Sequence, residues 1–369
     1  MNNYSSSTLI CLIKSVFIFL TISLSSSAIA KEWYPLQIEV WDPPFNKERQ
    51  RILKEYTPLQ KSEKRWDICV SIPHLKDAYW LAVNFGLVDE AKRLGVNLSI
   101  YEAGGYDRLE VQQKQIAECI DKNVDGLIIS AIAADGLNEL VKDASDRKIP
   151  VLDLINGINS PHLSARIAVD FFDTGFQAGE YLKQLVEKNS TKTHVAWFPG
   201  PEGAGWVAAG DKGFRTALKN THIEIIASLK GDTGIKAQSN LIESVLDDLG
   251  DNVSDKLDYI VGTTVSAEAA VSILRKRGLS KQIKVLSYYY GPGVHKGVKR
   301  GNILAAPTDS QAIQARIAVD TMVRILDGQP FFKHAAPIVK VIDRINQRTW
   351  DSTTTLAPRG FRPIFTVTK

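Results

Sequence analysis

The chain has 369 residues, and its 44% hydrophobic and 23% charged residues are the proportions of an ordinary globular protein. The formal net charge of +4 is too small for the basic surface that nucleic-acid binding requires. At roughly 100–200 residues per domain, this length predicts two globular lobes.

The first thirty residues show the features of a secretory signal peptide in the usual order. A single basic residue, Lys14, precedes the apolar run 16–24 and the small-residue motif of residues 28–30. The apolar run is shorter than the roughly 20 residues that a membrane-spanning helix needs. Cys11 lacks the preceding small residue of a lipoprotein anchor. We therefore expect cleavage after Ala30 and an exported mature protein.

From residue 64 onward, strand-like apolar runs alternate with helical patterns. The predicted strands are 68–72, 97–101, 126–130, 151–154, 194–197, 223–227, 259–261 and 283–287. The predicted helices are 81–94, 108–122, 136–147, 174–188, 206–218, 235–249, 267–277 and 311–326. This alternation is typical of parallel sheets built from β-α-β units, and there are enough units for one doubly wound sheet in each lobe.

The loops after these strands are the expected place for a ligand, because open parallel sheets bind ligands beyond the carboxyl ends of their strands. If the two lobes face each other, these loops line one cleft. They are residues 74–80, 102–106, 155–158, 198–206, 262–265 and 288–294.

Two cysteines remain after the predicted cleavage, Cys69 on a predicted strand and Cys119 on a predicted helix. An even pair in an oxidising compartment is a candidate disulfide. In the usual doubly wound order, the helix between the second and third strands packs over the first strand, which makes a bridge feasible. The alternative is two buried, unpaired thiols.

The sequence lacks motifs for catalysis, for metal binding and for phosphate binding. Its six histidines are scattered, with no H-E-x-x-H pair and no Cys-His metal spacing. There is no G-x-S-x-G motif, and the glycine-rich residues 200–205 lack the Lys-Ser/Thr of a phosphate loop. We therefore expect a binding protein without metal or cofactor, not an enzyme.

The mature chain resembles the ribose/galactose type of periplasmic binding protein over nearly its whole length. The matching segments are 66–86, 117–155, 168–175, 210–214, 262–270 and 285–301. The positions that read the sugar in ribose-binding members hold Ala208, the pair Ile155-Asn156, and Tyr289 here. The charge-assisted hydrogen bonds that hold a pyranose are therefore missing.

The resemblance implies a type I periplasmic binding protein, with two doubly wound lobes joined by a hinge of several crossovers. We expect an amino-terminal arm over residues 31–65. The amino-terminal lobe takes residues 66–169 and 310–338. The carboxyl-terminal lobe takes residues 170–309 and 339–369, and the tail is the last part of this segment, residues 351–369. Arm and tail have no clean periodic pattern, so each either binds a partner or wraps over the lobes.

Six motifs are similar to one branch of this family, whose members bind trimethylamine N-oxide and partner a membrane histidine kinase. The motifs lie at residues 75–80, 102–106, 198–201, 267–270, 297–301 and 360–363. The resemblance implies a periplasmic sensor that binds this ligand in the interlobe cleft and signals to the kinase to control trimethylamine N-oxide respiration. The alternative is a transport receptor that delivers a sugar or a methylated amine to a membrane importer.

Trimethylamine N-oxide carries three methyl groups on a positive nitrogen and one oxygen that only accepts hydrogen bonds. Methylated ammonium groups bind against aromatic faces, each contact contributing about 0.5–2 kcal/mol. The resemblance and this chemistry together predict nine ligand-binding residues: Asp77, Tyr79, Trp80, Tyr106, Phe171, Trp206, Thr264, Tyr289 and Asp309.

The oxide oxygen requires a hydrogen-bond donor in the site. The candidates are the indole N–H of Trp80, a Tyr hydroxyl, and the backbone N–H groups at the start of the helix after Asp77. Asp77 itself either faces the methyl groups or caps that helix. We expect Tyr288 and Tyr290 to pack in the lobe, outside the site.

Overall fold

The structure is a computed structural model that describes residues 33–46, 48–187 and 192–368. The predicted signal peptide lies outside these residues. From Trp33 onward the chain forms one compact unit. No helix in the described part has the length and apolar composition of a membrane span.

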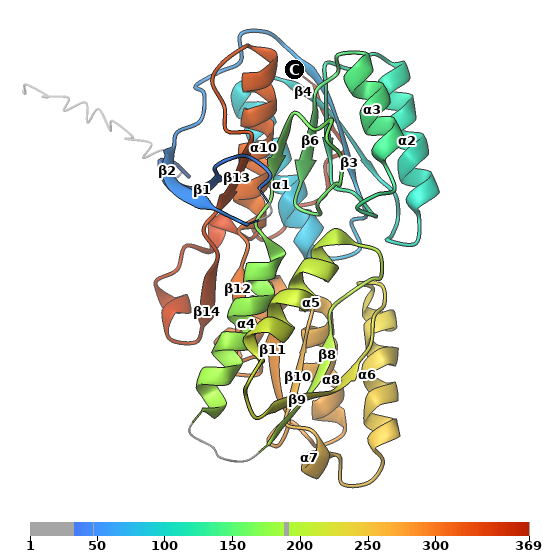
Figure 1. The fold of residues 1–369 in the computed structure, drawn as a ribbon, viewed down its shortest axis with the longest axis vertical. Helices are drawn as coiled ribbons and strands as arrows, with labels where there is room; N and C mark the ends of the chain where they lie inside the picture. The colour runs from blue at the N-terminus through green and yellow to red at the C-terminus, as the bar shows by residue number, and fades with distance from the viewer. Residues whose placement is uncertain (1–32, 47, 188–191, 369) are drawn as a thin grey trace, which may run out of the picture. The chain divides into compact units, whose positions relative to one another are not determined.

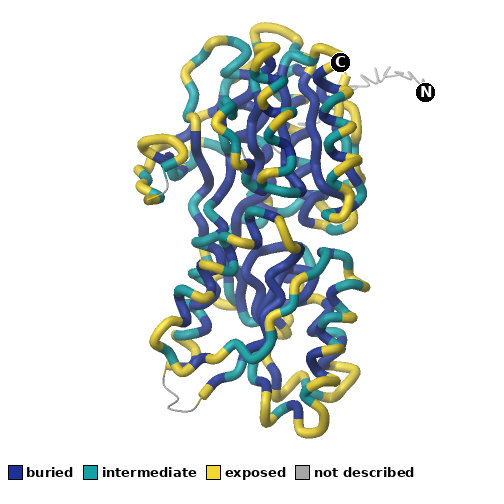
Figure 2. Tube along the Cα trace, turned by 45° about the vertical axis from the view of Figure 1, so that its right-hand side comes forward, coloured by how far each residue is buried: buried dark blue, intermediate teal, exposed yellow. Residues whose placement is uncertain are grey.

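The first lobe is built on a nine-stranded sheet of order β15-β4-β3-β5-β6-β7-β13-β1-β2. Its parallel centre comprises β3 (Asp67–Ile72), β4 (Asn97–Glu102), β5 (Gly126–Ile129), β6 (Val151–Leu154), β7 (Ala165–Ile167) and β13 (His334–Pro337). Four helices cover it: α1 (Ala78–Leu94), α2 (Leu109–Asp121), α3 (Asn138–Asp146) and α10 (Gln311–Leu326) (Figure 1). The central strands are buried because helices lie on both faces (Figure 2).

The second lobe holds a four-stranded parallel sheet of order β11-β10-β8-β9. Its strands are β8 (Thr193–Phe198), β9 (Ile223–Ser228), β10 (Tyr259–Gly262) and β11 (Lys284–Ser287). Its helices are α4 (Phe171–Val186), α5 (Gly205–Ala217), α6 (Ile235–Leu249), α7 (Val253–Lys256), α8 (Thr264–Lys276) and α9 (Pro292–Arg300). The predicted fold class, two α/β lobes with parallel sheets, is confirmed.

The chain passes between the lobes after β7, after β12 (Ala305–Thr308) and after β13. β12 pairs antiparallel with β14 (Lys340–Asp343) in a small separate sheet, which is followed by the short helices η1 (Asn346–Arg348) and η2 (Ser352–Thr354). These three crossings form the hinge, and the chain returns a last time to the first lobe at β15 (Thr366–Val367).

The arm and the tail both extend the nine-stranded sheet. β1 (Leu36–Trp41) pairs with β13, and β2 (Arg51–Tyr56) pairs with β1 as the edge strand. At the opposite edge, β15 (Thr366–Val367) pairs with β4. Of the two alternatives left open by the sequence, the structure shows arm and tail packed on a lobe.

The end of the tail corrects one of the predicted lobe limits. The sequence predicts residues 339–369 in the carboxyl-terminal lobe, but β15 belongs to the sheet of the amino-terminal lobe. The side chain of Asn84 on α1 anchors this segment, because it donates to the carbonyl oxygen of Ile364 at 2.8 Å and accepts from its N–H at 2.9 Å. The other lobe limits stay predictions.

Cys69 and Cys119 form a disulfide in the structure, and both residues are buried. Cys69 lies on β3 and Cys119 on α2, which joins β4 to β5. The bridge therefore ties α2 to the centre of the sheet across 50 residues of sequence.

Helices α4 and α5 cross with their backbones in contact. A Cβ atom added to Gly175 would lie 2.0 Å from the carbonyl oxygen of Gly210, and one added to Gly213 would lie 2.0 Å from that of Phe172. No other residue type allows this approach, because every other side chain begins with that Cβ. The two helices are therefore held as one body, which matters because α4 begins at Phe171 and α5 carries Trp206.

We predict that Gly175→Ala destabilises the protein by about 1–3 kcal/mol or more, because the new methyl group meets backbone that cannot move aside. Gly234→Ala is the matched control, since its Cβ would meet only a side-chain oxygen of Asp232 at 3.1 Å. Urea unfolding of both variants measures the difference. Equal free energies of unfolding for the two variants would contradict this account.

Candidate ligand-binding site

A small cavity lies between the two lobes, beyond the carboxyl ends of the parallel strands. Its walls are Asp77, Tyr79, Trp80, Tyr106, Ile155, Asn156, Phe171, Trp206, Thr233 and Tyr289. Six of these ten residues carry aromatic rings, and we call these six the aromatic cage: Tyr79, Trp80, Tyr106, Phe171, Trp206 and Tyr289. The water-accessible volume is about 10 Å³, which is the space of roughly one water molecule.

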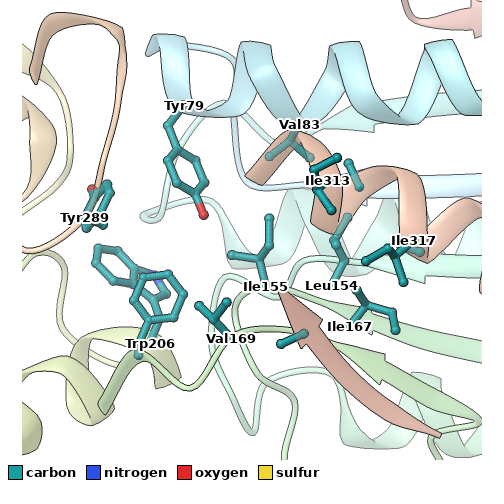
Figure 3. Close-up of a cluster of buried hydrophobic side chains, with 14 of the residues drawn as sticks. Tyr79, Val83, Leu154, Ile155, Ile167, Val169, Trp206, Tyr289, Ile313 and Ile317 are labelled. Atoms are coloured by element: carbon teal, nitrogen blue, oxygen red, sulfur yellow. The ribbon is translucent and has the colours of Figure 1, made fainter. Parts of the chain in front are cut away.

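The rings of the aromatic cage come from both lobes and contact each other across the cleft. The ring centres of Tyr79 and Tyr289 lie 5.4 Å apart, edge to face. Those of Trp206 and Tyr289 lie 5.7 Å apart, and those of Phe171 and Trp206 lie 5.6 Å apart. Figure 3 shows Tyr79, Tyr289 and Trp206 approaching one another from three different elements. These distances are typical of favourable aromatic pairs.

Asp77 determines where α1 begins and thereby places two rings of the aromatic cage. Its Oδ1 accepts hydrogen bonds from the N–H of Tyr79 at 3.0 Å and of Trp80 at 3.2 Å. The same side chain lines the cavity. Burial raises the pKa of Asp77 to about 6, and these two donors oppose the rise. Capping and facing the cavity, which the sequence presents as alternatives, therefore occur together.

The capping bonds remove one of the predicted donors for an oxide ligand. The backbone N–H groups of Tyr79 and Trp80 donate to Asp77, so they are engaged before any ligand arrives. The donors that remain from the prediction are side chains, the indole of Trp80 and the Tyr hydroxyls.

The hydroxyl of Tyr106 is the polar centre of the site. Its oxygen accepts from Nδ2 of Asn156 at 3.0 Å and from Nε1 of Trp206 at 3.1 Å. A phenol oxygen that already accepts two hydrogen bonds has its own proton left to donate. Burial raises the pKa of Tyr106 far above its ordinary value, so the proton is retained. Because Trp206 belongs to the other lobe, the bond also spans the cleft.

A strained turn positions the amide of Asn156. Ile155 follows β6 with φ of 70°, a conformation that β-branched residues rarely adopt. Nδ2 of Asn156 donates to the carbonyl oxygen of Ala131 at 2.8 Å as well as to Tyr106. Such strain recurs at ligand sites where the surroundings hold an unusual conformation in place.

Two predicted ligand contacts, Asp309 and Thr264, do not line the cavity. The hydroxyl of Tyr79 donates to Oδ2 of Asp309, and Nε2 of Gln314 donates to the same oxygen at 3.1 Å. Asp309 therefore lies behind the ring of Tyr79 and supports it. Burial raises the pKa of Asp309 to about 6.

Thr264 takes a similar supporting position beside Tyr289. Burial raises the pKa of Tyr289 well above its usual value, and hydrogen bonding with Thr264 and Thr263 opposes that rise. Tyr288 and Tyr290 are completely buried, as expected, and the hydroxyl of Tyr288 donates to the carbonyl oxygen of Pro199 at 2.5 Å.

Three residues of the cavity wall are not among the predicted ligand-binding residues: Ile155, Asn156 and Thr233. The first two lie in a loop that was expected to line the cleft, but they carry no ring. Thr233 follows β9, so the same rule about the carboxyl ends of strands includes it. Oγ1 of Thr233 lies 3.0 Å from Nε2 of His74, which joins the lobes at a second point. Burial lowers the pKa of His74 to about 4, so its ring is neutral at pH 7.

Comparison with known proteins identifies the family. Residues 68–330 match the family model of the periplasmic binding protein domain. The chain belongs to this family. Among curated periplasmic binding proteins and their relatives, it is similar to the periplasmic protein TorT of Escherichia coli strain K12. The two are 33% identical over 309 residues, which is 84% of this chain and 86% of TorT.

Two solved structures of periplasmic binding proteins are also similar to the chain. An ABC transporter solute binding protein from Bradyrhizobium sp. BTAi1, with bound bis-tris, is 45% identical with a TM-score of 0.78, covering 90% of this chain and 99% of that one. TorT in complex with the TorS sensor domain in the presence of TMAO is 34% identical with a TM-score of 0.72, covering 81% of this chain and 99% of that one.

The buried carboxyl of Asp309 leads to a prediction about pH. Its pKa is raised from 3.8 to about 6 in the folded protein, so folding favours the protonated form. The protonated Asp309 carboxyl therefore contributes to the free energy of unfolding below pH 4, and this contribution is lost as the pH rises through 6. The difference in free energy of unfolding between Asp309→Asn and the unmutated protein should therefore change by about 2–3 kcal/mol in favour of the variant between pH 4 and pH 7.

Urea unfolding at several pH values measures this effect. The control is Asp146→Asn on α3, where the Lys142 side chain lowers the pKa of an exposed carboxyl. The free energy of unfolding of that control, relative to the unmutated protein, should change with pH in the opposite direction. Parallel pH profiles for Asp309→Asn and the unmutated protein would refute the prediction.

Proposed function

We propose that this protein is a periplasmic sensor that binds trimethylamine N-oxide between its lobes and signals to a membrane histidine kinase of the TorS type. The aromatic cage with the Tyr106 donor at its centre carries this proposal. The complex of TorT with the TorS sensor domain, solved with TMAO present, supports both ligand and partner.

The chemistry of the cavity suits a small methylated amine oxide. The rings of Tyr79, Trp80 and Tyr289 face the methyl groups, each contact contributing about 0.5–2 kcal/mol when water is excluded. The carboxylate of Asp77 complements the positive nitrogen. The proton of Tyr106 is aimed by Asn156 and Trp206 to meet the oxide oxygen.

The ligand acts by joining the lobes. A ligand shifts the balance between open and closed lobes only if its affinity for the two states differs. Tyr106 and Trp206 come from different lobes, so contacts to both are available only in the closed state. Because the present cavity holds about one water molecule, five heavy atoms enter it only if the rings move apart. The kinase then responds to the changed surface.

We infer that the protein releases its ligand unchanged, as a binding protein of this family. The cavity wall holds one carboxylate and otherwise hydroxyl, amide, indole and apolar groups. In the described part of the chain, no cluster of three or more His, Cys, Asp or Glu residues could hold a metal ion. The proposal therefore rests on recognition alone.

Substitutions in the aromatic cage test the binding mode. We predict that Trp80→Ala and Tyr289→Ala each raise the Kd for trimethylamine N-oxide at least about tenfold, because each removes one aromatic wall. Phe85→Ala is the control, since Phe85 packs against Phe361 on another face of α1. Isothermal titration calorimetry measures all three. The proposal fails if both cage variants retain the original Kd.

A transport receptor is the second candidate, because the 45% identical structure is an ABC transporter solute binding protein with bound bis-tris. Bis-tris is a tertiary amine with hydroxylated arms, which extends the ligand class beyond methyl groups. Calorimetry with trimethylamine N-oxide, glycine betaine, bis-tris and ribose separates these ligands.

We expect tightest binding for trimethylamine N-oxide, since the cavity is small and its central polar group is a donor. The same titration in the presence of the kinase's periplasmic domain tests the sensor role. An unchanged Kd together with no detectable complex would favour the transport receptor.

A further inference from the structure

We infer that the hairpin of β1 and β2 is a clamp that holds the start of α4, and with it Phe171, against the other lobe. The clamp consists of Arg49 and Arg51 on the hairpin and of Asp170, Phe172 and Asp173 on the α4 side. Only the ligand-binding readout of this inference rests on the proposed function.

Two arginines of the hairpin contact the residues on either side of Phe171. Nε of Arg49 lies 3.3 Å from Oδ2 of Asp170, and the Arg49 guanidinium lies 3.6 Å from the centre of the Phe172 ring. Arg51 forms an ion pair with Asp173 and a second one with Glu39 at 2.9 Å. Asp170 in turn caps α4, accepting from the N–H of Phe172 at 2.9 Å.

These contacts cross from one lobe to the other. The hairpin is fixed to the first lobe because β1 pairs with β13, and the Trp41 ring stacks on His334 with centres 3.9 Å apart. α4 is fixed to the second lobe because Gly175 brings its backbone against that of α5. The clamp therefore acts on the arrangement of the lobes.

The clamp sets two arginines against three carboxylates, so the loss of either arginine leaves a larger excess of negative charge. Glu39 on the hairpin and Asp173 on α4 share Arg51 between them. Both carboxylates are partly buried, with side-chain exposures of 23% and 17%. Without Arg51, two carboxylates from different lobes would face each other with little solvent screening. Removal of this one charge therefore replaces one attraction between the lobes by a repulsion and leaves the contacts of Arg49 as the attractive part of the clamp.

Two residues of the hairpin loop have unusual backbone conformations. Phe45 and Arg49 have φ of 60° and 56°, values that non-glycine residues rarely adopt. Arg166, on β7, lies over the Phe45 ring with its guanidinium 5.5 Å from the ring centre. Strained residues persist where the surrounding contacts over-determine them. Arg49, one of these two residues, is the one that contacts Phe172.

The clamp affects the ligand through the closed state. Phe171 and Trp206 form one wall of the cavity, with ring centres 5.6 Å apart, and both lie on the joined helices α4 and α5. If the start of α4 moves away from the hairpin, this wall moves with it. A smaller closed population raises the apparent Kd in proportion, although no clamp residue touches the ligand.

The first experiment needs no ligand. Small-angle X-ray scattering should give a larger radius of gyration for Arg51→Gln than for the unmutated protein, because the lobes separate. Arg147→Gln is the matched control, since Arg147 pairs with Asp143 on the exposed face of α3. The inference is overturned if the radius of gyration of Arg51→Gln equals that of this control.

The second experiment measures the Kd for trimethylamine N-oxide. Arg51→Gln should raise it about fivefold or more. The double variant Arg51→Gln/Asp173→Asn should recover part of the loss, because the repulsion between Glu39 and Asp173 is gone. A merely structural role for Arg51 predicts no such rescue, and its absence would overturn the inference. If the unmutated protein does not bind the ligand, the proposed function fails, whereas the scattering comparison still decides the clamp.

Discussion

The site depends on one buried hydroxyl, that of Tyr106, which accepts a hydrogen bond from each lobe. Asn156 donates from the first lobe and Trp206 from the second. The oxygen thereby accepts two hydrogen bonds, so its own proton is left to donate. In the proposed function this proton meets the acceptor oxygen of the ligand, and the arrangement is complete only when the lobes are closed. The aromatic rings then add contact area around a fixed polar point.

The starts of three helices supply most of the aromatic cage. Tyr79 and Trp80 lie in the first turn of α1, Phe171 opens α4, and Trp206 lies in the first turn of α5. A side chain in the first turn is placed by the cap, so Asp77 and Asp170 control ring positions through backbone N–H groups. Burial of the Asp77 carboxyl is the cost of this arrangement and raises its pKa to about 6.

Two sets of contacts connect the cavity to the surface of the protein. Glycines hold α4 against α5, so that Phe171 and Trp206 move together. The hairpin of β1 and β2 meets the start of α4 through Arg49 and Arg51. Any partner that displaces this hairpin therefore acts on the cavity wall without touching the ligand, and a ligand that moves the wall acts on the hairpin.

Local sequence determines much of the secondary structure of this protein. Alternating apolar periods are a property of neighbouring residues, so β3 to β6, β8 to β11 and the long helices are predictable, as is the capping role of Asp77. The short parallel strands β7 and β13 and the helix α9 are not among the predicted elements. The aromatic residues of the site follow from family resemblance combined with ligand chemistry. Short edge and hinge strands such as β1, β2, β12 and β14 escaped prediction, because their pairing partners lie far away in the sequence.

Tertiary structure alone decided which side chains meet across the cleft. Asn156 and Thr233 join the cavity wall because of where the lobes place them, whereas Asp309 is displaced behind Tyr79 by the hydrogen bond between them. The contact between Arg51 and Asp173 joins residues 122 positions apart. No local pattern specifies such pairs, because their energy depends on distances that exist only after both lobes have folded and closed.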